Sequence, residues 1–217
     1  MTVNHLTVRE YRLPVIAALL AACAGSVDVF AFFGVGNAFA GIVTGNLVTA
    51  SYGIASGDAA LIRPTVTAVA GCILGELAWA RLLRRPGTAL PLLIAELTLL
   101  VLVLIAWLAA GSHPGGALQL IMLGFVSVAL GGQSIWALRA HQTTTYFTGM
   151  LTTAINKASA GSTADLRVSV RQLCALVTGA IVSAVVLREV RPVTPAVPLL
   201  LLAAAVVVET VTPPRDM

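Results

Sequence analysis

The 217 residues are 58% hydrophobic and only 10% charged, with a mean hydropathy of +0.95, whereas a water-soluble domain carries about 25% charged residues. This composition excludes a soluble globular protein and predicts an integral membrane protein embedded in the lipid bilayer. The net charge of +4 does not indicate a nucleic-acid partner, because the basic residues form short clusters between apolar runs, as topology signals do.

Apolar runs that are long enough to cross a bilayer, which takes about 20 helical residues, follow one another along the chain. The first run is too long for the hydrophobic part of a signal peptide, so we expect it to be a membrane span. Residues 38–56 and 143–158 are rich in Gly, Thr, Ser and Asn, and are either full spans or partial, re-entrant helices. The six predicted spans are 13–35, 65–83, 89–110, 117–138, 171–188 and 195–212.

The distribution of Lys and Arg distinguishes six spans from eight, because cytoplasmic loops carry the excess of positive charge. If neither ambiguous segment crosses and the N-terminus is cytoplasmic, ten of these residues lie inside and three outside. If both segments cross, seven lie inside and six outside. The first arrangement is favoured, although Arg188 and Arg191 count against it. It predicts a multi-pass membrane protein with both termini in the cytoplasm.

The two ambiguous segments share the motif Thr-Gly-x-Leu-x-Thr. The sequence reads TGNLVT at 44–49 and TGMLTT at 148–153. Small and hydroxylated residues replace the Leu and Val of an ordinary span at these positions. Transporters place discontinuous helices of this kind near the middle of the bilayer, where the exposed backbone groups bind a solute or an ion.

The two halves of the chain also correspond in order. GSVD at 25–28 precedes the first motif, and GGQS at 131–134 precedes the second. With six spans the halves begin on opposite sides of the membrane, so we predict an inverted three-plus-three repeat of residues 13–110 and 117–212. The predicted fold is all-α, a polytopic membrane helical bundle with six transmembrane helices and two partial or re-entrant helices. It forms a single transmembrane domain over residues 1–217.

These motifs resemble the YoaK-type family of bacterial inner-membrane proteins, and the resemblance covers essentially the whole chain. It implies a protein with about six spans whose activity is unknown. The family usually has Asn after the Gln of its second block, where this chain has Ser134. The residues that carry the resemblance are Ala24–Asp28, Val43–Asn46, Gly132–Gln133, Arg139 and Thr144–Leu151.

Side-chain amides and hydroxyls fall in the middle of each half, near an intramembrane acid. Neutral donors and acceptors suit a polar uncharged or zwitterionic solute. The alternative is ordinary hydrogen bonding between helices, which contributes about 0.6 kcal/mol per bond in a membrane protein. The predicted substrate-binding residues are Asp28, Thr44, Asn46, Gln133, Ser134 and Thr148.

Three ionisable residues are candidates for coupling or gating: Asp28, Glu76 and Arg139. An ionised carboxylate inside a span costs about 2.5–3.5 kcal/mol, so Asp28 is either a proton or cation site or a structural acid bonded to the first partial helix. Glu76 alternatively pairs with Arg81, and positive-inside placement alone explains Arg139. Glu96 is predicted to form an interfacial ion pair with the neighbouring basic residues 84 and 85.

The sequence contains no H-E-x-x-H, C-x-x-C, Walker or G-x-S-x-G motif, so we expect no metal, no cofactor and no enzymatic activity. The first functional hypothesis is a small-solute permease or secondary transporter, with Asp28 as the coupling acid. The alternatives are a channel-like facilitator and a scaffold or interaction protein that does not transport. Small-residue faces on several helices permit a homodimer.

Overall fold

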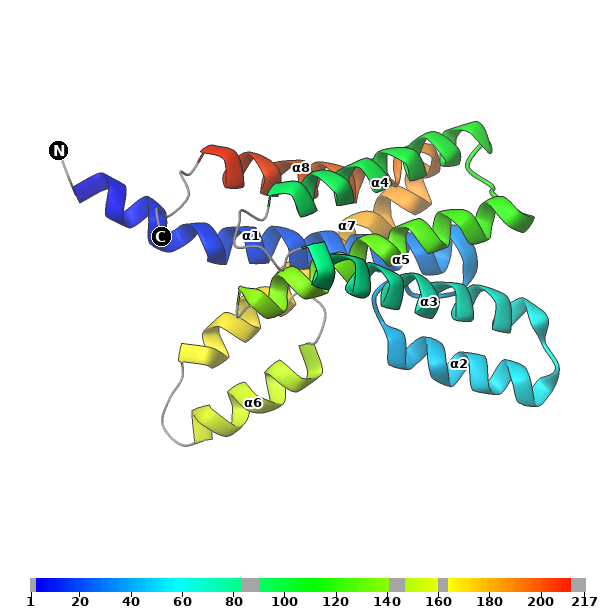
Figure 1. The fold of residues 1–217 in the computed structure, drawn as a ribbon, viewed down its shortest axis with the longest axis horizontal. Helices are drawn as coiled ribbons and strands as arrows, with labels where there is room; N and C mark the ends of the chain where they lie inside the picture. The colour runs from blue at the N-terminus through cyan, green and yellow to red at the C-terminus, as the bar shows by residue number, and fades with distance from the viewer. Residues whose placement is uncertain (1–2, 83–89, 141–146, 160–163, 212–217) are drawn as a thin grey trace.

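The computed structural model describes residues 3–82, 90–140, 147–159 and 164–211, and all the regular secondary structure in this part is helical (Figure 1). A π-helix, η1, continues α1, and a 3₁₀ turn, η2, precedes α8. The elements are α1 (Val3–Val29), η1 (Phe30–Gly36), α2 (Val43–Ser56), α3 (Ala59–Leu82), α4 (Leu90–Ala109), α5 (Gly116–Arg139), α6 (Phe147–Ser159), α7 (Ala164–Glu189), η2 (Arg191–Val193) and α8 (Ala196–Val211).

Six helical stretches in the described residues are long and apolar enough to cross a membrane, which fits a multi-pass membrane protein and confirms the six predicted spans. Helices α2 and α6 have 14 and 13 residues, fewer than the 17–25 or so that a spanning helix needs. The six stretches are Arg12–Gly36, Ala59–Leu82, Leu90–Ala109, Gly116–Arg139, Asp165–Glu189 and Arg191–Val211.

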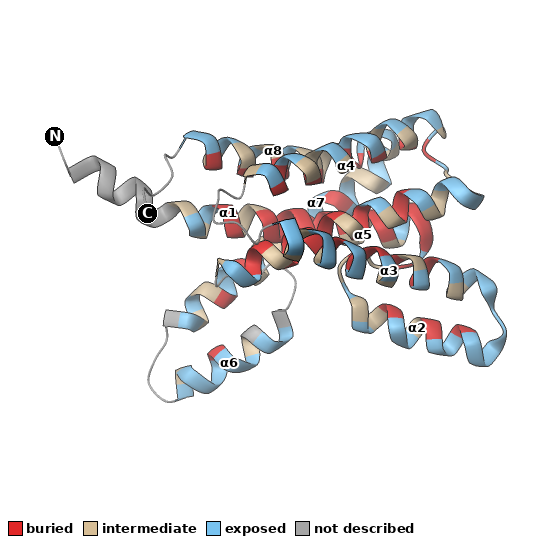
Figure 2. Cartoon of the chain, in the orientation of Figure 1, coloured by how far each residue is buried: buried red, intermediate tan, exposed pale blue. Residues whose placement is uncertain are grey.

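Helices α1 and α5 lie at the centre of the bundle. The first packs against α7 and α8, the second packs against α3 and α4, and α4 contacts α8. The short helices lie beside the spans that follow them, α2 along α3 and α6 along α7 (Figure 1). Buried residues accordingly concentrate on α1 and α5, while the outer helices expose apolar side chains (Figure 2). Such faces suit contact with lipid.

Glycines allow the central helices to approach closely. In the α1–α7 pair, Gly25 and Gly179 each face a backbone carbonyl of the other helix, and in the α3–α5 pair Gly75 and Gly131 do the same. A Cβ at any of these four positions would collide with backbone atoms. Because lipid supplies no hydrophobic driving force between helices, such close backbone packing is a main source of their association.

The chain leaves the helical conformation after η1. The π-helix ends at Asn37, which has a left-handed φ of 54° and whose N–H donates to the carbonyl of Phe32 at 2.9 Å. A non-helical segment, residues 37–42, then leads to α2, which begins at Val43. Irregular backbone inside a membrane requires cover from protein or a watery cavity.

Candidate functional site

A cavity of about 350 Å³ lies between α1, the non-helical segment 37–42, the start of α6 and α7. This volume is near the lower end of the range typical of small-molecule sites, about 300–1,000 Å³. The lining residues are Ala24, Gly25, Asp28, Val29, Phe33, Phe39, Gly41, Ile42, Thr148, Leu173, Leu176 and Ala180. The cavity therefore includes residues from both segments that contain the Thr-Gly motifs.

Asp28 is the only charged residue among the described residues that line this cavity. Its Oδ1 accepts a hydrogen bond from the backbone N–H of Gly41 at 2.9 Å, and the backbone of Ala40 also donates to the carboxylate. Among the described residues, no cationic side chain pairs with Asp28. The carboxylate thus holds the non-helical segment against α1 and leaves a negative charge beside the cavity without a counter-ion from the described part of the chain.

Asn46 fixes the same segment from the other side. Its Oδ1 accepts from the N–H of Phe39 at 2.9 Å, and its Nδ2 donates to the Phe39 carbonyl at 2.6 Å. The side chain is buried, and both of its polar atoms are used by one residue of the backbone. Asn46 therefore positions the ring of Phe39 in the cavity wall, and a solute could reach the amide only by breaking these bonds.

The two motif threonines are placed differently. Thr148, in the first turn of α6, lines the cavity. Thr44, in the first turn of α2, is exposed and does not line it. The structure thus brings Thr148 to the cavity that Asp28 also lines and leaves Thr44 outside it.

Gln133 and Ser134 on α5 are buried but do not line the cavity. The Nε2 of Gln133 donates to the carbonyl of Leu20 on α1 at 2.7 Å, and the Oγ of Ser134 donates to the carbonyl of Leu130 at 3.0 Å. Of the six residues predicted to bind solute, the structure brings two to the cavity wall, Asp28 and Thr148.

The other coupling candidates also lie elsewhere. Glu76 is half-buried on α3, where its Oε1 lies 4.0 Å from the Sγ of Cys72. Arg139 is exposed at the C-terminal end of α5. Neither lines the cavity. Glu96 is 1% exposed and its carboxylate oxygens have no hydrogen-bond partner in the described part of the chain, and the basic residues 84 and 85 fall outside that part.

The apolar wall is the part of the site that the sequence analysis did not identify. Phe33 and Phe39 supply aromatic rings, and Leu176 and Ala180 face them from α7. The sequence contained one indication of an aromatic wall: four of the six phenylalanines fall between residues 30 and 39. The described residues contain no group of three or more His, Cys, Asp or Glu side chains that could hold a metal ion.

Comparison with known proteins returns one family. A family model described as "Protein of unknown function (DUF1275)" matches residues 16–208, a stretch that includes both Thr-Gly motifs and every residue that lines the cavity. No curated protein and no solved structure matches the chain.

Proposed function

The chain belongs to the DUF1275 family, whose function is unknown, and we propose that it is a small-solute permease or secondary transporter with its site in the cavity beside Asp28. The family match confirms what the sequence motifs implied, an uncharacterised family. The transport activity is inferred from the site alone.

One observation carries the proposal. A single cavity collects the intramembrane carboxylate of Asp28, the non-helical residues Gly41 and Ile42 that precede α2, and Thr148 at the start of α6. Acids within spans are rare and generally mark a substrate, ion or proton pathway. Irregular backbone beside such an acid is the arrangement by which transporters bind solutes near the bilayer midplane.

The packing pattern supports the inverted repeat that we propose for this transporter. If each of α1–α4 is matched in order with α5–α8, α1 corresponds to α5, and α3 and α4 correspond to α7 and α8. The α1–α7 contact then corresponds to the α5–α3 contact, and the α1–α8 contact corresponds to the α5–α4 contact. The close glycines correspond as well, Gly25 with Gly131 and Gly179 with Gly75. In Figure 1, α2 runs from the middle of the bundle towards one end and α6 runs towards the other. We therefore assign α2 and α6 as re-entrant half-helices.

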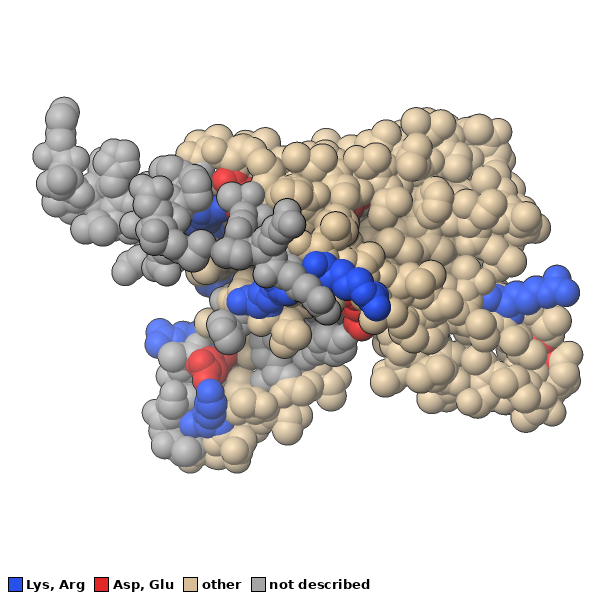
Figure 3. Space-filling view, viewed as in Figure 1, with Lys and Arg blue, Asp and Glu red and all other residues tan. Residues whose placement is uncertain are grey.

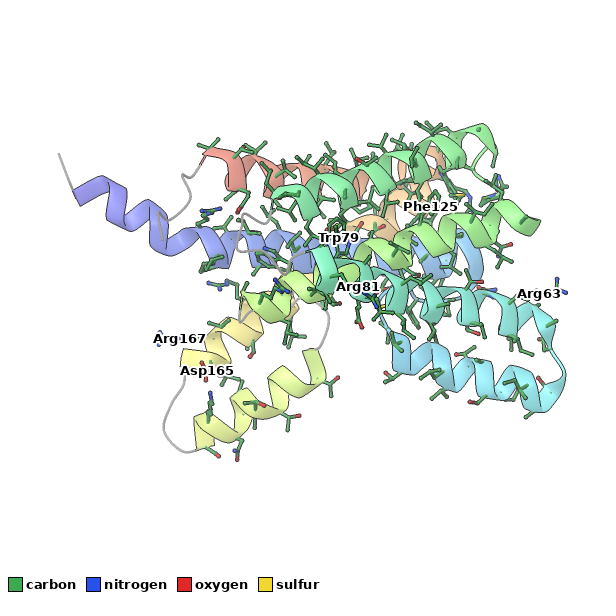
Figure 4. The ribbon with its side chains drawn as sticks, viewed as in Figure 1. Arg63, Trp79, Arg81, Phe125, Asp165 and Arg167 are labelled. Atoms are coloured by element: carbon green, nitrogen blue, oxygen red, sulfur yellow. The ribbon has the colours of Figure 1, made fainter. Side chains whose placement is uncertain are left out.

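The positions of the basic residues support cytoplasmic termini. Figure 3 shows most of the visible Lys and Arg side chains towards the end of the bundle where α1 begins, and Figure 4 labels Arg167 at that end, Arg81 near the middle and Arg63 at the opposite end. By the positive-inside rule, the end that carries Arg167 faces the cytoplasm.

Single-cysteine labelling tests this orientation. Cysteine replaces Arg63 in one variant and Arg167 in another, in a chain whose native cysteines 23, 72 and 174 are changed to serine or alanine. A membrane-impermeant maleimide added to intact cells should label position 63 and spare position 167. The reverse pattern would contradict the proposed orientation.

Thermal stabilisation of the purified protein tests the function. A ligand at a hundred times its Kd stabilises the folded state by about 2.7 kcal/mol. We screen wild type, Asp28→Asn and Asp165→Asn at two pH values against a panel of amino acids, sugars, nucleosides, organic acids and drug-like amines. Asp165→Asn is the control, because the wild-type Asp165 carboxylate is exposed and pairs with Lys157. The proposal predicts that one solute class stabilises wild type and Asp165→Asn but not Asp28→Asn.

Flux into proteoliposomes separates the remaining outcomes. Uptake of the stabilising solute that depends on a proton gradient supports a coupled transporter, whereas rapid flux without this dependence points to a facilitator. If no solute stabilises the protein, and Asp28→Asn merely lowers its stability, the proposal fails in favour of a scaffold.

A further inference from the structure

The chemistry of the cavity wall limits the solutes that it can bind. Apart from Asp28 and Thr148, the described side chains that line it are apolar or absent. Sugars and amino acids need several directed hydrogen bonds, and each one left unmade in a buried site costs about 1–3 kcal/mol. The amides that the sequence offered for this purpose, Asn46 and Gln133, bond instead to backbone groups. A polar uncharged solute therefore lacks partners.

The described residues of the cavity wall include an acidic side chain and no basic one. Among the described residues, Asp28 accepts hydrogen bonds from backbone N–H groups only, and no cationic side chain neutralises it. A proton would neutralise the carboxylate but would leave the cavity of about 350 Å³ unfilled. An occupant that carries a positive charge and an apolar body satisfies both the carboxylate and the wall.

We propose that the cavity binds a hydrophobic organic cation, such as an amphipathic amine or quaternary ammonium compound, with its charge at Asp28 and its apolar body between Phe33, Phe39 and Ala180. The faces of phenylalanine rings attract cations, by about 0.5–2 kcal/mol depending on desolvation. This inference rests on the proposed function and specifies the substrate class of the same site.

Two described cations lie in an adjoining hollow. Arg188 and Arg191 line a second pocket of about 360 Å³ that shares Val29 and Phe33 with the first. Arg188 is highly exposed beside Glu189, with its Nε 3.4 Å from a carboxylate oxygen. Arg191 donates to the carbonyls of Ser112 and Gly34. Neither guanidinium pairs with Asp28, and both disfavour approach of a cation through this hollow. A hydrophobic cation, which partitions into lipid, is therefore expected to reach the site from the bilayer.

Binding of benzyltrimethylammonium to the full-length protein in detergent tests the inference. Phenylmethanesulfonate, which has the same phenylmethyl body and the opposite charge, is the matched control ligand. Equilibrium dialysis should show saturable binding of the cation to wild type and to Asp165→Asn. Asp28→Asn should weaken it at least tenfold, which corresponds to about 1.4 kcal/mol. The anion should not bind saturably to any of these proteins.

A second variant keeps the test independent of Asp28. Ala180→Leu adds volume to the wall on α7 and leaves the carboxylate in place, so it should also weaken binding at least tenfold. Equal binding of the cation and the anion would overturn the inference, as would cation binding that neither variant weakens.

If another solute class stabilises the protein in an Asp28-dependent way and the cation does not bind, the substrate class is wrong and the transporter proposal stands. If nothing binds in an Asp28-dependent way, both fall.

Discussion

The crossing of α1 and α7 should not tolerate a single added methyl group at Gly179. A Cβ at this position would lie 2.6 Å from the carbonyl carbon and 2.8 Å from the Cα of Ala22, whereas ordinary contacts begin near 3.4 Å. These neighbours are backbone atoms, so no rotamer change relieves the overlap and the two helices must move apart. Overpacking of this kind costs about 1–3 kcal/mol. The better helix propensity of alanine offsets up to about 1 kcal/mol, so Gly179→Ala should lower the free energy of unfolding by about 1–2 kcal/mol.

Gly149 on α6 provides the matched control, because a Cβ there meets nothing within 4 Å. Gly149→Ala should therefore stabilise the protein slightly, by about 0.5 kcal/mol, through the smaller entropy of the unfolded chain. Unfolding in mixed micelles with increasing dodecyl sulfate measures both variants against wild type. If Gly179→Ala proves as stable as wild type, or if both variants shift in the same direction, the close crossing described above is wrong.

Three further predictions use the same unfolding assay. Asn46→Leu should cost about 2 kcal/mol, because a backbone N–H and a carbonyl of the non-helical segment lose their partners; an equal loss for Asn156→Leu, an exposed site on α6, would contradict this explanation. Arg191→Lys should lower the free energy of unfolding by about 1 kcal/mol, because lysine cannot reproduce the two hydrogen bonds to carbonyls and the stacking on the Trp107 ring. Arg188→Lys, at a highly exposed site, should leave the stability unchanged. Glu96→Met should stabilise the protein by about 1 kcal/mol or more, since an apolar chain of similar length replaces a buried carboxyl group without a described hydrogen-bond partner; a loss of stability would refute the reasoning.

Apolar length predicted the existence of the six spans but not where the helices begin. The first predicted span, 13–35, agrees closely with Arg12–Gly36. By contrast, α3 begins at Ala59 and α7 at Ala164, six and seven residues before their predicted spans. Both extensions contain charged residues, which lower the hydropathy of a window without ending a helix. Hydropathy reports what lipid tolerates, whereas the end of a helix depends on capping and on the following turn.

The Thr-Gly motifs predicted two short helices, and the structure contains α2 and α6 at those places. The motifs did not predict which polar side chains face the cavity. The Asn46 side chain bonds to the backbone of Phe39, because backbone that leaves a helix inside a membrane must find hydrogen-bond partners. The apolar wall of the cavity could not be predicted from the sequence for another reason. Phe33 and Ala180 share a cavity only because α1 crosses α7, and the period of a hydrophobic pattern does not specify which helices pair.

The proposed repeat is symmetric in its helix packing and asymmetric in its chemistry. The position equivalent to Asp28 is Ser134, whose hydroxyl bonds back to its own helix at Leu130. At the second crossing, Trp79 of α3 packs against Gly132, so a large ring occupies space beside the counterpart of the first crossing. A transporter of this design would carry the charged recognition group, Asp28, in one half, while both halves contribute to the cavity wall. Inserting an acid at Ser134 should therefore not restore solute binding to Asp28→Asn, because Ser134 is not among the described residues that line the cavity.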